Sequence, residues 1–190
     1  KTSRCDDPAV SLTIPPRCPR GAHLGLSILQ YHACYERSFI SDRRLVEEYQ
    51  RLLHQWFAAH PNGRASIICF YSADKPSDDR AIAQQIAAAF ENEQLEIVDP
   101  QGQLRVCLET FRELSHVVAM RYHAQVLAWL FGIPQVVIAY HRKNFDHAET
   151  VKMPPSRIIG IREFLANEHA QLFEEFFAMG SGGRSRAPSC

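Results

Sequence analysis

The stretch HVVAMRYHAQVLAWLFGIPQVVIAY, residues 116–140, decides the fold of this chain. Residues 116–120 and 134–140 are apolar almost throughout, which predicts two strands that are buried on both faces. Residues 122–132 predict a helix between them, and Gly132-Ile133-Pro134 predicts the turn that ends it. Apolar strands that alternate with helices predict a parallel sheet covered on both sides.

The same alternation continues outward from this stretch in both directions. Further strands are predicted at 23–31, 65–71, 95–99 and 157–160, and further helices at 41–60, 78–92, 105–114 and 162–180. We therefore expect a doubly wound α/β domain over residues 23–179, with its ligand site outside the carboxyl ends of the strands. Residues 1–22 are Pro-rich and predict an arm or linker, and residues 180–190 predict a disordered tail. Either end could equally be a remnant of truncation.

Composition excludes several classes of protein. Lys plus Arg and Asp plus Glu number 21 each among 190 residues, so the basic excess typical of nucleic-acid binders is absent. No apolar run approaches the length of a membrane span, and no leader-like segment opens the chain. The six cysteines are widely spaced and form no CxxC, which argues against structural zinc and favours a reducing cytoplasm. Cys69 and Cys107 are predicted to be small buried hydrophobic residues.

Polar and cationic residues follow the predicted strands. The candidates at the carboxyl edge are Gln30, Tyr31, His32, Tyr71, Ser72, Asp74, Asp99, Arg121, His123, His141, Arg142 and Lys143. A cationic edge on a chain of zero net charge predicts an anionic ligand.

Arg121 and His123 are the most informative pair. Residues two apart on a helix point in nearly opposite directions, so the two can share a ligand only if Arg121 is still extended. The helix would then begin at Tyr122 or His123, and its start lacks a Ser, Thr, Asp or Asn cap. A bound phosphate or carboxylate could meet the free N–H groups there, with Arg121 adding a two-pronged contact. The alternative is a solvated Arg121 and a His123 that packs against a loop.

Other polar residues are expected to be structural or solvated. The chain has no GxGxxG after a strand, no P-loop and no GxSxG elbow. Asp78 and Asp79 look like helix-capping residues, and His169 is expected to face solvent. His32 follows the first strand, where it could be a second acid/base, an acceptor-binding group or a loop anchor.

Residues 120–143 resemble the C-terminal motif of the polysaccharide pyruvyl transferase family. That motif is a strand, Arg-x-His-Ala, an apolar helix, Gly-Ile/Val-Pro, a strand, then Tyr and Lys. It is matched by Arg121, His123, Ala124, Gly132, Ile133, Pro134, Tyr140 and Lys143. The resemblance extends more loosely over roughly residues 23–178.

The resemblance implies a Rossmann-like domain similar to the C-terminal half of a GT-B fold. It implies transfer of a pyruvyl group from phosphoenolpyruvate to a sugar of an exopolysaccharide or cell-wall polymer, without a further cofactor or metal. His123 would be the catalytic acid, with His32 as a second catalytic candidate. Arg121 would hold the carboxylate or phosphate, Lys143 would balance the leaving-group charge, and His141, Arg142 and Ser72 would complete the substrate site. Such a protein would be cytoplasmic, or peripheral to the inner membrane.

The chain departs from the family pattern because it offers only the C-terminal of two domains. A homodimer or a partner chain could supply the other wall of the cleft. Two alternatives remain open: half of a GT-B glycosyltransferase that binds a nucleotide sugar, and a truncated, non-catalytic domain that binds a ligand or a partner.

Overall fold

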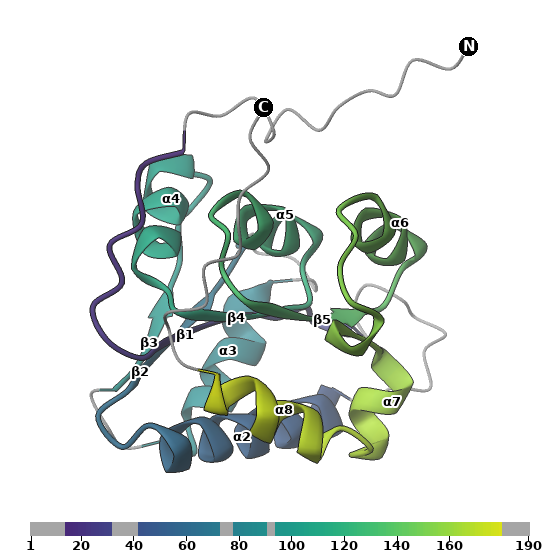
Figure 1. Ribbon diagram of the computed structural model, residues 1–190. Helices are drawn as coiled ribbons and strands as arrows, with labels where there is room; N and C mark the ends of the chain where they lie inside the picture. Colours follow the sequence, from purple (N-terminus) through teal and green to yellow (C-terminus); the bar gives the residue numbers. More distant parts are fainter. Residues whose placement is uncertain (1–13, 32–41, 73–77, 91–93, 180–190) are drawn as a thin grey trace.

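The structure is a computed structural model that describes residues 14–31, 42–72, 78–90 and 94–179. Within them, six parallel strands form one sheet in the order β3-β2-β1-β4-β5-β6 (Figure 1). The strands are β1 (His23–Ser27), β2 (Arg64–Ile68), β3 (Leu95–Val98), β4 (His116–Ala119), β5 (Gln135–Ala139) and β6 (Ile158–Gly160). This order confirms the predicted doubly wound, Rossmann-like sheet.

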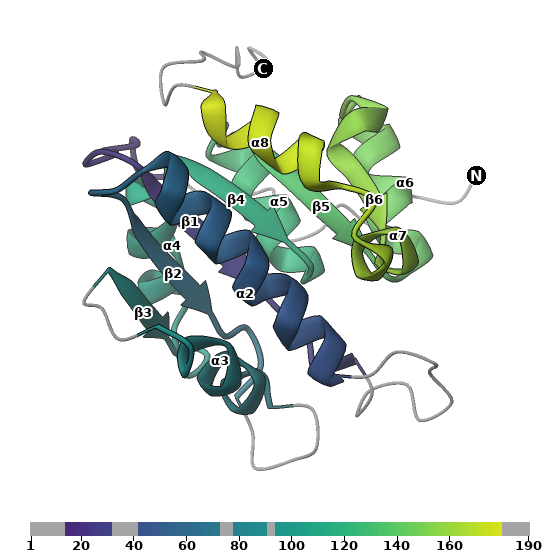
Figure 2. The ribbon, with the colours of Figure 1, turned by 90° about the horizontal axis from the view of Figure 1, so that it is seen from below.

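Helices cover both faces of the sheet (Figures 1 and 2). One face carries α4 (Leu104–Glu113), α5 (Tyr122–Leu130) and α6 (Arg142–Thr150), and the other carries α2 (Asp42–Ala59), α3 (Asp79–Ala87), α7 (Ile161–Ala166) and α8 (Ala170–Ala178). A short 3-10 helix, η2 (Pro155–Arg157), precedes β6. Every residue of β1, β4 and β5 is buried, as expected for strands covered on both sides.

Two apolar cores lie on the two sides of the sheet. The core under α2 and α8 is rich in aromatic side chains and includes Trp56, Phe173 and Phe177. The core under α4 and α5 includes Phe111 and Leu127. Burial of this apolar surface, worth about 25 cal/mol per Å², is the dominant favourable contribution to folding.

Sequence periodicity predicts no helix over α6, because residues 142–150 lack an apolar stripe. Its only two buried residues are Asn144 and Ala148. The Asn144 Nδ2 donates to Gln125 Oε1 at 3.2 Å, and the Gln125 Nε2 donates to the Asn144 carbonyl at 3.0 Å. Amide contacts with α5 therefore hold α6 in place where hydrophobic periodicity gives no signal.

The predicted C-terminal helix is two helices. Asn167 adopts a left-handed conformation with φ 59° and ends α7, and α8 starts afresh at Ala170. The prediction that His169 faces solvent is wrong, since it is 7% exposed. Its ring stacks on Phe164 and contacts Phe173 edge-on, with centroids 4.8 and 5.1 Å away, and burial lowers the pKa of this histidine.

The segment before β1 contacts the layer of α4 and α5. The Arg17 Nη2 donates to the Leu114 carbonyl at 2.8 Å, and its Nη1 donates to the Gly132 carbonyl at 3.2 Å. The Cys18 N–H donates to the Arg112 carbonyl at 2.8 Å. Residues just before β1 are therefore tied to the domain through the ends of two helices.

No helix in the described ranges has both the length and the apolar character needed to cross a bilayer.

Candidate functional site

The junction between β4 and α5 lies at the centre of the sheet. β4 pairs with β1, and the chain leaves these two strands toward opposite edges of the sheet, β1 leading to β2 and β4 to β5. Ligands of doubly wound folds bind at such a switch point, outside the carboxyl ends of the strands. Arg121 follows β4 at this point.

Arg121 is extended and α5 begins one residue later. Arg121, with φ −70° and ψ 135°, is the N-cap of α5 and makes no side-chain capping hydrogen bond. This confirms the predicted helix start at Tyr122. The Ser27 Oγ accepts from the N–H groups of Met120 and Arg121 at 3.0 and 3.1 Å, which fixes the junction against the end of β1.

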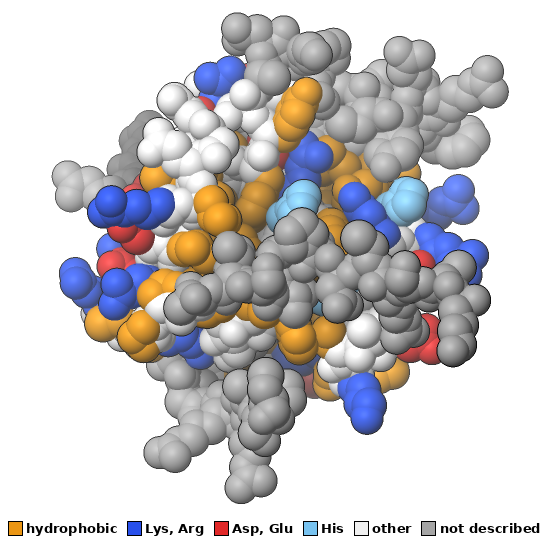
Figure 3. Space-filling model, turned by 90° about the horizontal axis from the view of Figure 1, so that it is seen from above, with side chains coloured by type: hydrophobic (Ala, Val, Ile, Leu, Met, Phe, Trp, Pro, Cys, Tyr) orange, Lys and Arg blue, Asp and Glu red, His pale blue; other side chains and the backbone are white. Residues whose placement is uncertain are grey.

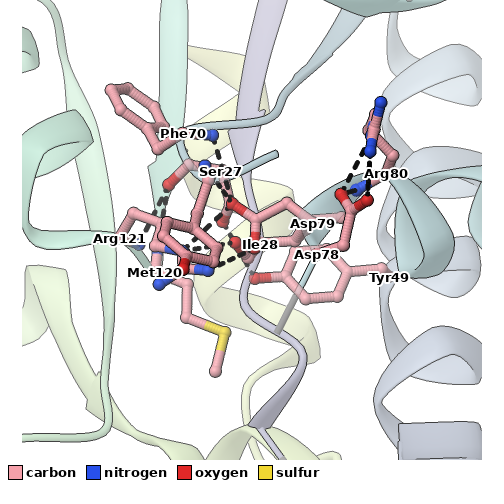
Figure 4. Close-up of polar contacts among 10 residues, drawn as sticks. Ser27, Ile28, Tyr49, Phe70, Asp78, Asp79, Arg80, Met120 and Arg121 are labelled. Atoms are coloured by element: carbon pink, nitrogen blue, oxygen red, sulfur yellow. Dashed lines mark hydrogen bonds and ion pairs between the residues drawn. The ribbon is translucent and has the colours of Figure 1, made fainter. Parts of the chain in front are cut away.

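The Arg121 side chain forms a buried ion pair with Asp79 (Figure 4). Its Nε donates to Asp79 Oδ2 at 3.1 Å, and its Nη2 donates to Oδ1. The Nε also approaches the Ile28 carbonyl at 3.2 Å. The side chain of Asp79 is 0% exposed and that of Arg121 is 17% exposed. The alternative of a solvated Arg121 is therefore wrong.

Asp79 is more than the capping residue that the sequence indicated. Asp78 is the N-cap of α3, and its Oδ1 accepts from the Arg80 N–H at 2.9 Å. Asp79 instead accepts from the N–H groups of Phe70 and Tyr71, both at 3.1 Å, at the end of β2. Burial raises the pKa of the Asp79 carboxyl, while Arg121 and the two backbone N–H groups act in the opposite direction.

His123 lies at a cavity of about 180 Å³ between α4, α5 and the carboxyl ends of β2 and β3. The other walls are mainly apolar and include Phe70, Leu127, Cys69 and Cys107. Both cysteines are buried, as predicted. Burial raises the pKa of the Cys69 thiol to about 12 and also raises that of Cys107, so both thiols are protonated at neutral pH.

Tyr122 lies between His123 and Lys143. The Lys143 Nζ is 5.2 Å from the centre of the Tyr122 ring, a cation–π distance, and the His123 ring is 5.9 Å from the same ring. Lys143 belongs to the first turn of α6, so this aromatic ring connects the carboxyl ends of β4 and β5. Sequence reasoning passed over Tyr122, although its place inside the Arg-x-His motif was a usable signal.

His141 and Arg142 line a second hollow, open and about 400 Å³ in volume, beyond the end of β5. Tyr31, Tyr140 and Phe145 also contribute to it. His141 caps α6, its Nδ1 accepting from the Lys143 N–H at 3.2 Å. Arg142 makes an exposed ion pair with Asp146 at 3.5 Å.

Ser72 lies beyond the end of β2, in a different group of polar side chains. Its Oγ donates to Asp99 Oδ1 at 2.7 Å, and Asp99 also lies 3.8 Å from the Arg80 guanidinium. The predicted residue His32 lies outside the described residues. Among the residues that are described, no three His, Cys, Asp or Glu side chains are grouped to hold a metal ion.

The side of the molecule formed by α4, α5 and α6 carries both cationic and apolar surface. Histidine and Lys or Arg side chains lie there next to exposed hydrophobic side chains (Figure 3). The carboxyl edge thus offers a fixed arginine at the switch point, an apolar cavity at His123 on one side, and a cationic, aromatic hollow on the other. This arrangement can hold a small anion that also carries an apolar part.

The sequence matches a known protein family. A family model described as polysaccharide pyruvyl transferase matches residues 7–142, well over half of the chain. The match includes Arg121, His123 and His141 and ends one residue before Lys143. Neither curated proteins nor solved structures gave a match. On the extent of the family match, the chain belongs to the polysaccharide pyruvyl transferase family.

Proposed function

We propose that the domain binds phosphoenolpyruvate at the carboxyl end of β4 and transfers its pyruvyl group to a saccharide of an exopolysaccharide or cell-wall polymer. The observation that carries the proposal is Arg121, extended at the uncapped start of α5 and at the switch point of the sheet. A helix N-terminus with an adjacent guanidinium favours phosphate or carboxylate groups. Phosphoenolpyruvate carries one of each.

Arg121 holds the donor in this scheme. Its guanidinium makes a two-pronged contact with the carboxylate or the phosphate, and the α5 N–H groups face the other charged oxygens. Lys143, next to Tyr122, balances the charge that develops on the departing phosphate.

His123 supplies the proton. Protonation of the enol methylene carbon gives a methyl group and leaves an oxocarbenium-like centre on the neighbouring carbon. A sugar hydroxyl attacks that centre and loses its proton, which reprotonates His123. Phosphate departs with the electrons of its C–O bond, and a second hydroxyl attacks the same carbon, closes the ketal and gives its proton to the released phosphate. His123 is exposed at the rim of an apolar cavity, and the apolar walls suit the uncharged methylene end of the donor.

A ligand titration followed by thermal shift tests the donor. Phosphoenolpyruvate is expected to raise the melting temperature of the wild-type chain, and Arg121→Ala to abolish the rise. Arg105→Ala is the matched control, because Arg105 lies in an exposed ion pair on α4, and it should respond like the wild type. A rise with UDP-sugars alone would instead support a glycosyltransferase half, and no rise with any ligand would support a non-catalytic domain.

A further inference from the structure

Asp79 is fully buried and has no role of its own in the proposed transfer. Asp79 comes from the first turn of α3, yet its carboxylate lies against the side chain that follows β4 (Figure 4). We propose that Asp79 is a positioning residue, which holds one edge of the Arg121 guanidinium so that the opposite edge faces the anionic group of the donor. This inference rests on the proposed function and assigns to Asp79 the orientation of its anion-binding arginine.

The planar guanidinium has two edges that can each bind an oxyanion with two hydrogen bonds. One edge consists of Nε and Nη2, and both of these atoms bond to Asp79. The other edge consists of Nη1 and the outer N–H of Nη2, which point away from Asp79 because the group is planar. The arginine can therefore bridge a protein carboxylate and a ligand carboxylate or phosphate.

The accessible surface of the ion pair belongs to the arginine. Asp79 is completely buried, whereas 17% of the Arg121 side chain is exposed. Asp79 is itself held in place, because Oδ2 accepts from the N–H groups of Phe70 and Tyr71. The Tyr71 ring, with its centre 5.9 Å from the Arg121 Cζ, further limits the movement of the guanidinium.

Removing the Asp79 charge can either weaken or tighten anion binding, and the direction distinguishes a positioning role from a general electrostatic effect. Asp79 neutralises much of the Arg121 charge, so a purely electrostatic role predicts that Asp79→Asn tightens anion binding. A positioning role predicts weaker binding, because the guanidinium then has to be ordered when the ligand binds.

The test measures dissociation constants by calorimetry for phosphoenolpyruvate and for inorganic phosphate. Asp79→Asn is expected to weaken the binding of phosphoenolpyruvate by about tenfold or more, at unchanged stoichiometry. The matched control is Asp78→Asn, a change at the neighbouring N-cap that does not contact Arg121, and it should stay within about twofold of the wild type. Arg121→Lys should also lose about tenfold or more, because an ammonium group paired with Asp79 has no second edge.

The outcomes distinguish the two proposals. Unchanged or tighter binding by folded Asp79→Asn overturns the positioning role, while loss of binding in Arg121→Ala still upholds the function. A wild-type chain that binds neither anion overturns both. If circular dichroism shows that Asp79→Asn is unfolded, Arg121→Lys decides, and wild-type affinity in that variant overturns the positioning role.

Discussion

Replacement of Asp79 by alanine should be among the most destabilising single changes at the carboxyl edge of the sheet. The side chain is 0% exposed and shares its carboxylate among Arg121 and the N–H groups of Phe70 and Tyr71. Removing one partner of a buried ion pair leaves the other charge without compensation, which costs about 3–5 kcal/mol. We expect a loss of that size in the free energy of unfolding.

Urea unfolding at pH 7, followed by far-UV circular dichroism, measures this loss, and thermal unfolding should show a fall of roughly 6–20 °C. Asp78→Ala is the control, because Asp78 caps the same helix and pairs with the partly exposed Arg80. It should cost only about 1 kcal/mol. The double variant Asp79→Ala/Arg121→Met removes both charges and should recover about 2 kcal/mol relative to the sum of the single changes. A loss below about 1 kcal/mol for Asp79→Ala, or one no larger than that of Asp78→Ala, would refute the reasoning.

Two further predictions concern the rest of the sheet. Burial lowers the pKa of His23 and of His116 to about 4, so the unfolded chain binds more protons than the folded one between about pH 6.5 and pH 4. The free energy of unfolding, measured in urea, should therefore fall as the pH is lowered through this range, by up to about 3 kcal/mol per histidine. In His116→Gln the fall should be about half as large, because only His23 then contributes, and an unchanged fall would contradict the role of His116. A Cβ at Gly25 would collide with the Leu114 side chain, so Gly25→Val should cost about 1–3 kcal/mol, and an unchanged urea midpoint would contradict this.

The architecture could be predicted from sequence because it depends on local patterns. The apolar strands, their alternation with a helix, and the missing cap before α5 are all visible between His116 and Tyr140. The same information predicted correctly that Arg121 is extended and that α5 begins at Tyr122. These features depend on backbone and burial preferences within a few residues.

The partner of Arg121 could not be predicted in this way. Asp79 lies 42 positions away in sequence and looks like any acidic residue in the first turn of a helix. Only the pairing of strands shows that the end of β2 and the start of α3 face the end of β4. His169 was mispredicted for a related reason, since the break at Asn167 turns it toward the aromatic core.

The position of β1 in the sheet has a consequence for folding during synthesis. Of the six strands described in this sheet, β1 comes first in the sequence, yet it pairs with β2 on one side and with β4 on the other. The half-sheet β3-β2-β1 can assemble as soon as Val98 has emerged from the ribosome. From then until Ala119 emerges, the backbone N–H and C=O groups on the β4-facing edge of β1 lack their partner strand, and such an open edge can pair with other nascent chains.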